Sequence, residues 1–153
     1  MKKIISIIIF IPFLLSANFI GMNSGARSLS MGDAFVALSD GTSAIFYNPA
    51  GLSRIDEFHL IASRQNLYGL SDLHNDMLAI SLPTPTLQTG LAVQQINLVD
   101  AYSEKIFYFS IATTTRTNVP IRFGVSLKYE SAKVEGYKDV KDPDNFDMDL
   151  GIL

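Results

Sequence analysis

The chain has 153 residues and no cysteine, and its 12 basic and 15 acidic residues give a net charge of −3. This length allows one domain, and the acidic balance argues against a basic nucleic-acid surface. Without cysteine the chain has no disulfide scaffold, no thiolate zinc site and no cysteine nucleophile. Charged residues make up 18% of the chain, below the average of about 25% for soluble domains.

The first 17 residues are typical of a secretory signal peptide. Lys2 and Lys3 precede an apolar run over residues 4–15, and the small residue Ala17 follows as a cleavage position. The apolar run is too short for a transmembrane helix, which needs about 20 residues. The sequence therefore predicts export and cleavage near Ala17.

Residues 18–56 are rich in glycine, alanine and serine and predict short helical turns. Apolar residues at helical spacing predict a helix over residues 31–38, and a second short turn is expected over residues 43–47. Asn48 is a natural N-cap for a third turn, because Pro49 suits the first helical position. This region is too short and has too few apolar residues to fold alone, so it needs a surrounding structure against which to pack.

Residues 57–153 change to the period-two pattern of β-strands. The alternation is strictest over residues 121–129, and turn signals rich in proline and asparagine separate the apolar runs. Six strands are predicted, over residues 58–66, 77–82, 90–99, 107–112, 121–129 and 146–152.

This alternation is compatible with two all-β architectures. In a soluble sandwich the apolar face points to a core, whereas in a membrane barrel it points to lipid and the polar face lines the lumen. Three features favour the barrel: strands near the 9–11 residues that cross a bilayer, tyrosines near strand ends, and charges that share one strand face. Those tyrosines are Tyr68, Tyr102, Tyr129 and Tyr137, and those charges are Arg122, Lys128, Asp147 and Asp149.

Four stretches in order resemble the FadL-like outer-membrane proteins, and the PorV/PorQ-like group most of all. The stretches GARSLSMGDAFVAL at residues 25–38 and SAIFYNPAGL at residues 43–52 are similar to the plug of that family. The later stretches RFGVSLKY at residues 122–129 and DLGIL at residues 149–153 resemble its barrel strands. Asp33 stands where many relatives have glycine.

The resemblance implies a transmembrane antiparallel β-barrel in the outer membrane, with residues 18–56 as an N-terminal plug and residues 57–153 as the first strands. Transport members of the family take up long-chain fatty acids or other hydrophobic compounds, whereas PorV-like members bind exported proteins in secretion. Outer-membrane lipids, a hydrophobic ligand or secretion proteins are thus the implied partners. Matching positions imply a plug and ligand-path site at Gly32, Asp33, Asn48, Pro49, Ala50 and Gly51. The alternative is that these residues only cap and pack the plug.

No catalytic motif is present, so the chain is not expected to be an enzyme or to hold a cofactor. The two histidines, His59 on a strand and His74 in a predicted loop beside Asp72 and Asp76, are interpreted as solvated polar residues rather than metal ligands. An acidic group at Asp142, Asp144, Asp147 and Asp149 lacks the glycine and terminal glutamate of an EF-hand loop. It is interpreted as a turn that leads into a strand.

Six strands are fewer than the roughly eight of the smallest single-chain membrane barrels. The sequence therefore predicts a signal peptide, a plug and an incomplete barrel, truncated at the C-terminus, which is unable to transport by itself. A soluble periplasmic β-domain is the remaining alternative, and free solubility of the mature chain would favour it over the barrel.

Overall fold

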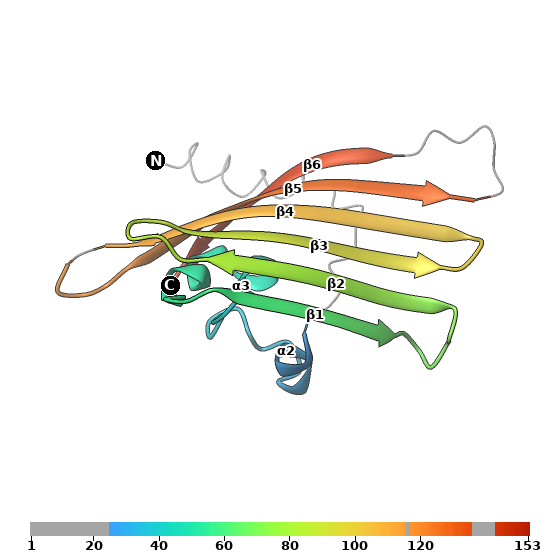
Figure 1. Ribbon diagram of the computed structural model, residues 1–153, viewed down its shortest axis with the longest axis horizontal. Coiled ribbons are helices and arrows are strands. Elements are labelled where there is room, and N and C mark those ends of the chain that lie inside the picture. The colour runs from blue at the N-terminus through green and yellow to red at the C-terminus, as the bar shows by residue number, and fades with distance from the viewer. Residues whose placement is uncertain (1–24, 116, 136–142) are drawn as a thin grey trace, which may run out of the picture.

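The computed structural model describes residues 25–115, 117–135 and 143–153, so the predicted signal peptide lies outside the described residues. Six strands form one antiparallel sheet whose strand order is the chain order (Figure 1). The strands are β1 (His59–Asn66), β2 (Leu73–Leu82), β3 (Gln88–Leu98), β4 (Tyr102–Thr114), β5 (Arg122–Val134) and β6 (Asp144–Ile152). The predicted all-β class and the six predicted strands are confirmed.

Each strand pairs with the next one along the chain, as in a β-meander. The sheet is open, and β1 and β6 are its edges within the described residues. β4 and β5 each have 13 residues and exceed their predictions, because their polar ends continue the ladder beyond the apolar alternation. The turn predicted at the acidic group that begins with Asp142 is wrong in part, since β6 already begins at Asp144.

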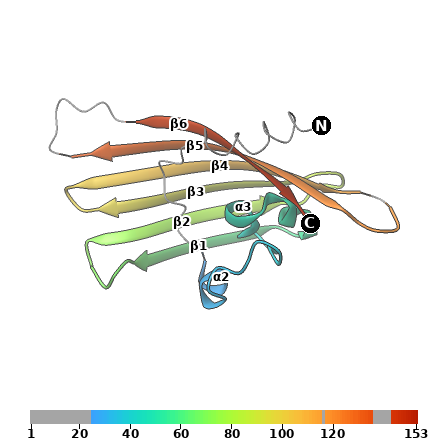
Figure 2. The ribbon, with the colours of Figure 1, turned by 180° about the vertical axis from the view of Figure 1, so that it is seen from behind.

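Within the described residues, three short helices precede the sheet: α2 (Ala26–Ser30), α3 (Ala44–Tyr47) and the 3₁₀-helix η2 (Pro49–Arg54). We refer to residues 25–55 as the helical segment. Figure 2 shows α3 against one face of the sheet, toward the end where the C-terminus lies. We call this face the inner face and the opposite one the outer face. None of the helices in the described residues is long and apolar enough to cross a membrane.

The cap predicted at Asn48 is confirmed, because its side-chain oxygen accepts a hydrogen bond from the Ala50 N–H at 3.2 Å and Pro49 begins η2. The helix predicted over residues 31–38 is wrong, since this stretch is a run of turns. Gly32 and Asp33 have φ values of 60° and 62°, and successive left-handed residues interrupt a right-handed helix. The helix lies earlier, at α2.

The core lies between the helical segment and the inner face. Ile45 and Leu52 are fully buried there, and Phe46 packs edge-on against Tyr108 with ring centroids 5.1 Å apart. Most of the inner-face residues in this core are alanines, which lets the short helices approach the strands closely. The core residues are Ala44, Ile45, Leu52, Ile55, Ala79, Ala92, Ile106, Tyr108 and Ala112.

Candidate functional site

A band of apolar residues crosses the outer face over all six strands. Because side chains alternate between faces and all five strand pairs are in register, the outward residues align in rows perpendicular to the strands. One row comprises Leu60, Ile80, Leu91, Phe109, Leu127 and Met148, and the next comprises Ala62, Leu78, Val93, Phe107, Tyr129 and Phe146. We call these two rows the apolar rows.

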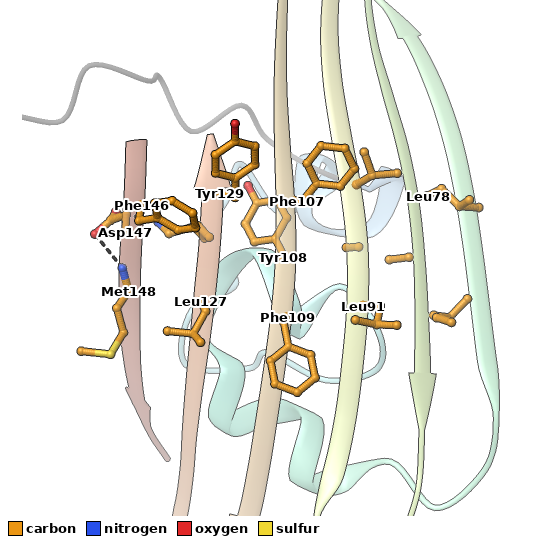
Figure 3. Close-up of a pocket in the computed structure, with 15 residues that line it drawn as sticks. Leu78, Leu91, Phe107, Tyr108, Phe109, Leu127, Tyr129, Phe146, Asp147 and Met148 are labelled. Atoms are coloured by element: carbon orange, nitrogen blue, oxygen red, sulfur yellow. Dashed lines mark hydrogen bonds and ion pairs between the residues drawn. The ribbon is translucent and has the colours of Figure 1, made fainter. Parts of the chain in front are cut away.

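The apolar rows are exposed. Leu127 is 52% exposed and Phe146 78%, although residues of these types are usually buried. An open groove of about 940 Å³ runs over the rows, and Figure 3 shows its aromatic and aliphatic side chains lying along neighbouring strands. Tyr129 and Phe146 contact each other across β5 and β6 with ring centroids 4.9 Å apart. A continuous exposed apolar surface of this kind marks a site of interaction.

A polar row bounds the apolar rows on the side away from the helical segment. Arg64 and Asp76 form a double ion pair across β1 and β2, with both nitrogen–oxygen distances 2.6 Å. The register continues this row through every strand, so the change from apolar to polar occurs at the same level across the sheet. The polar row comprises Arg64, Asp76, Gln95, Lys105, Ser131 and Asp144.

The inner face carries a set of buried polar residues beside the apolar residues of the core. The Gln94 amide donates to Asn75 Oδ1 at 3.2 Å, and the Tyr108 hydroxyl donates to Gln94 Oε1 at 3.3 Å. Such bonds satisfy polar groups that would otherwise destabilise a buried surface. The buried polar residues of this face are Asn75, Ser81, Gln94, Glu104, Ser110, Ser126 and Glu130.

Charged groups on the inner face gather at β5 and β6. Lys128 Nζ lies 3.1 Å from Asp147 Oδ2 and 3.0 Å from Asp149 Oδ1. The prediction that Arg122, Lys128, Asp147 and Asp149 share a strand face is confirmed by the register. The acidic group predicted near residue 144 is thereby divided, because Asp144 belongs to the outer polar row and Asp142 lies outside the described residues.

The residues around Asn48 lie directly against the inner face. A Cβ on Gly124 of β5 would overlap Pro49 and Ala50, and a Cβ on Gly151 of β6 would overlap the Asn48 side chain. The Asn48 amide also donates to Ile152 O and to Val36 O, both at 3.2 Å. Asn48 therefore joins the turns of the helical segment to β6.

The other candidate residues of the helical segment have different surroundings. A Cβ on Gly51 would overlap the backbone of Ser39, so this glycine allows two turns of the segment to pack together. Asp33 accepts a hydrogen bond from the Tyr47 hydroxyl at 2.9 Å. Gly32 is exposed, with open space around it. The structure thus brings Asn48, Pro49 and Ala50 to the sheet and leaves Gly32 away from it.

The histidines occupy strand positions with single carboxylate neighbours. His59 begins β1, with Nε2 3.3 Å from Glu57 Oε1. His74 lies in β2 with Nε2 3.5 Å from Asp76 Oδ2; its predicted loop position is therefore wrong, because β2 extends further back than its alternating part. Among the residues that the structure describes, no three histidines or carboxylates gather as a metal site would need.

Three inner-face glycines were not singled out by the sequence reasoning. Gly90, Gly124 and Gly151 all lie where a Cβ would overlap the helical segment. Glycine weakens a strand unless another part of the chain approaches it closely. Glycines on the inward side of three strands were therefore the signal in the sequence that could have indicated this packing.

Comparison of the chain with protein-family models, with curated proteins and with solved structures found no match.

Proposed function

We propose that the sheet is part of the wall of an outer-membrane β-barrel, and that the helical segment is a plug in its lumen. The observation that carries this proposal is the polarity of the two faces. In a soluble β-sandwich the apolar face packs into the core and the polar face meets water. Here the apolar face is exposed, whereas the face that the helices cover carries buried serine, glutamine and glutamate residues beside the alanines of the core.

The position of the aromatic residues supports this orientation in a bilayer. Phe107, Tyr129 and Phe146 stand beside one another in the apolar row next to the polar row. Aromatic girdles flank the lipid-facing band of membrane barrels, where rings meet headgroups. The apolar rows then contact acyl chains, and the polar row lies at the membrane surface.

Closure of the barrel requires more strands than these six. The smallest single-chain membrane barrels have about eight strands, and an open edge in hydrocarbon leaves backbone groups without partners. The ladder of β6 directs the N–H and C=O groups of outward residues such as Leu150 away from β5. Further strands pair with this edge and with β1 in the complete wall.

The function that we infer is uptake of hydrophobic compounds, such as long-chain fatty acids, across the outer membrane. The contacts of Asn48, Pro49 and Ala50 with glycines of the wall support this function. Because a glycine has no side chain, the plug can make small shifts against the wall at these contacts. The inner face, with its hydrogen-bonded polar residues, lines the lumen of the proposed barrel. Shifts of the plug then open a path for the ligand through this lumen. This also agrees with the resemblance of the plug stretches to the FadL-like family.

The wall proposal is tested with single-cysteine variants, each of which carries the only cysteine of the chain. Leu127→Cys is in an apolar row, Lys105→Cys in the polar row and Gln65→Cys on the inner face. Each variant is labelled with bimane and reconstituted with brominated lipid. We expect strong quenching only at residue 127. Equal quenching at residues 127 and 65 would refute the lipid-facing orientation.

The uptake proposal is tested in a strain that lacks the gene. A labelled long-chain fatty acid and a neutral hydrophobic compound are supplied, and their entry is compared with that in the complemented strain. We expect slower entry of at least one compound. Unchanged uptake of both together with loss of a secreted protein would refute transport and support a secretion role instead.

A further inference from the structure

Most charged side chains of the outer face are held in ion pairs. Arg64 and Asp76 bind each other across β1 and β2, and His74 Nε2 lies 3.5 Å from the same aspartate. Lys133, which lies two residues beyond the polar row on β5, has its Nζ 3.9 Å from Glu135 Oε1. These charges are therefore matched by partners from the chain itself.

Two opposite charges of the polar row are left over. Lys105 of β4 and Asp144 of β6 are exposed, and neither takes part in an ion pair within the residues that the structure describes. Ser131 of β5 lies between them in the register. Because neighbouring strands are about 4.8 Å apart, about 10 Å separates the two backbone positions, whereas Arg64 and Asp76 stand on adjacent strands.

The space between these two charges suits a zwitterionic group. A phosphate beside Lys105 and an ammonium beside Asp144 each gain charge-assisted hydrogen bonds, and the Ser131 hydroxyl can donate to the phosphate as well. The lysine stem is flexible and adjusts to the length of the group. A ligand with a phosphate alone would meet the repulsion of Asp144, so the arrangement favours a headgroup that carries both charges.

Aromatic rings lie directly next to the three polar residues. Phe107, Tyr129 and Phe146 are two positions away from them on β4, β5 and β6 and share their face. The Tyr129 ring centroid is 6.4 Å from that of Phe107 and 4.9 Å from that of Phe146. Figure 3 shows these rings toward one end of the groove, with Leu127 and Met148 further along it. Acyl chains attached to the headgroup would therefore enter the apolar groove.

We infer that the outer face over β4, β5 and β6 binds a membrane lipid with a phosphoethanolamine headgroup. The headgroup lies on Lys105, Ser131 and Asp144, and the acyl chains follow the groove. This inference rests on the proposed function, in which this face meets the bilayer, and it names the lipid that the wall selects there.

The test measures which lipid occupies the groove. The full chain with Leu127→Cys is labelled with bimane and reconstituted in mixtures of phosphatidylethanolamine, phosphatidylcholine and phosphatidylglycerol, of which one at a time is brominated. Quenching then reports the relative occupancy of each lipid beside residue 127. We expect phosphatidylethanolamine to be enriched about fivefold over each of the other two, as two exposed charge contacts allow.

Two pairs of substitutions in the same row separate this site from a general effect of charge. Lys105→Gln/Asp144→Asn is expected to abolish the enrichment, whereas Arg64→Gln/Asp76→Asn removes the same two charges from a closed ion pair and is expected to preserve it. Quenching in a bilayer of brominated lipid alone shows that each variant keeps its wall intact.

The outcomes distinguish the inference from the proposed function. Equal quenching by the three lipids, or enrichment of a lipid other than phosphatidylethanolamine, overturns the inference and leaves the proposed function standing. An enrichment that survives in Lys105→Gln/Asp144→Asn, or that disappears equally in Arg64→Gln/Asp76→Asn, overturns it as well. Absence of quenching by every brominated lipid refutes the proposed function itself.

Discussion

Replacing Gly124 by alanine perturbs the closest contact between the helical segment and the sheet. A Cβ at this position would overlap the Pro49 carbonyl group and the Ala50 nitrogen. These are backbone atoms that cannot rotate away, so either η2 lifts from β5 or the strand bends. Overpacking a well-packed site costs about 1–3 kcal/mol, and we expect Gly124→Ala to lower the free energy of unfolding by about 3 kcal/mol, the upper end of that range.

Gly90 on β3 provides the matched comparison. A Cβ there would lie 2.7 Å from Ile45 Cδ1 and 2.9 Å from Ile45 Cγ1, which are atoms of a side chain rather than of the backbone. We therefore expect Gly90→Ala to cost only about 1 kcal/mol. Ile45→Val removes the nearer atom and is expected to relieve Gly90→Ala. No truncation of a side chain removes the backbone overlap at Gly124.

The measurement is urea unfolding of the full chain in detergent micelles, followed by tyrosine fluorescence, since the chain has six tyrosines and no tryptophan. Trypsin cleavage after the exposed Arg54 reports whether η2 has moved. We expect faster cleavage in Gly124→Ala than in Gly90→Ala. If Gly124→Ala is no more destabilising than Gly90→Ala, and Arg54 is equally protected in both, the direct seating of η2 on β5 is refuted.

Three further predictions follow from the contacts of the inner face. Asn48→Ala removes the cap of η2 and the hydrogen-bond donors to Val36 O and Ile152 O. We therefore expect it to lower the free energy of unfolding in urea by about 2–4 kcal/mol. A smaller loss than that of the exposed control Ser30→Ala would contradict this prediction. Thr42→Val leaves buried Ser81 Oγ without its partner at 2.8 Å and is expected to cost about 1–3 kcal/mol, whereas Thr42→Val/Ser81→Ala should recover most of that loss in the same assay. Lys128→Met removes the cation between Asp147 and Asp149, whose side chains are 48% and 41% exposed. We expect it to lower the free energy of unfolding by about 1 kcal/mol, and we expect this loss to shrink in 1 M salt because salt screens the ion pairs. A loss that does not depend on salt would show that packing of the lysine stem is responsible.

The strands could be predicted from the chain because period-two alternation is a local property. Residues 121–129 alternate so regularly that β5 is evident, and the charges at Arg122, Lys128, Asp147 and Asp149 share a face, as the alternation requires. Caps are local as well, and Asn48 with Pro49 predicts the start of η2 correctly. The helix over residues 31–38 fails because apolar spacing does not report the left-handed backbone at Gly32 and Asp33.

Alternation by itself defines two faces of each strand but does not decide which face is covered. That decision depends on where the helical segment packs. It packs on the inner face because Gly124 lets the backbone of Pro49 and Ala50 approach, while Gly90 and Gly151 leave room for the side chains of Ile45 and Asn48. The cross-strand register then aligns the apolar rows and brings Glu104 diagonal to Glu130 from 26 residues apart in the chain. The sequence by itself thus determined the strands and the composition of their two faces. Only the tertiary structure decided that the apolar face is exposed, because register and packing join residues that are distant in the chain.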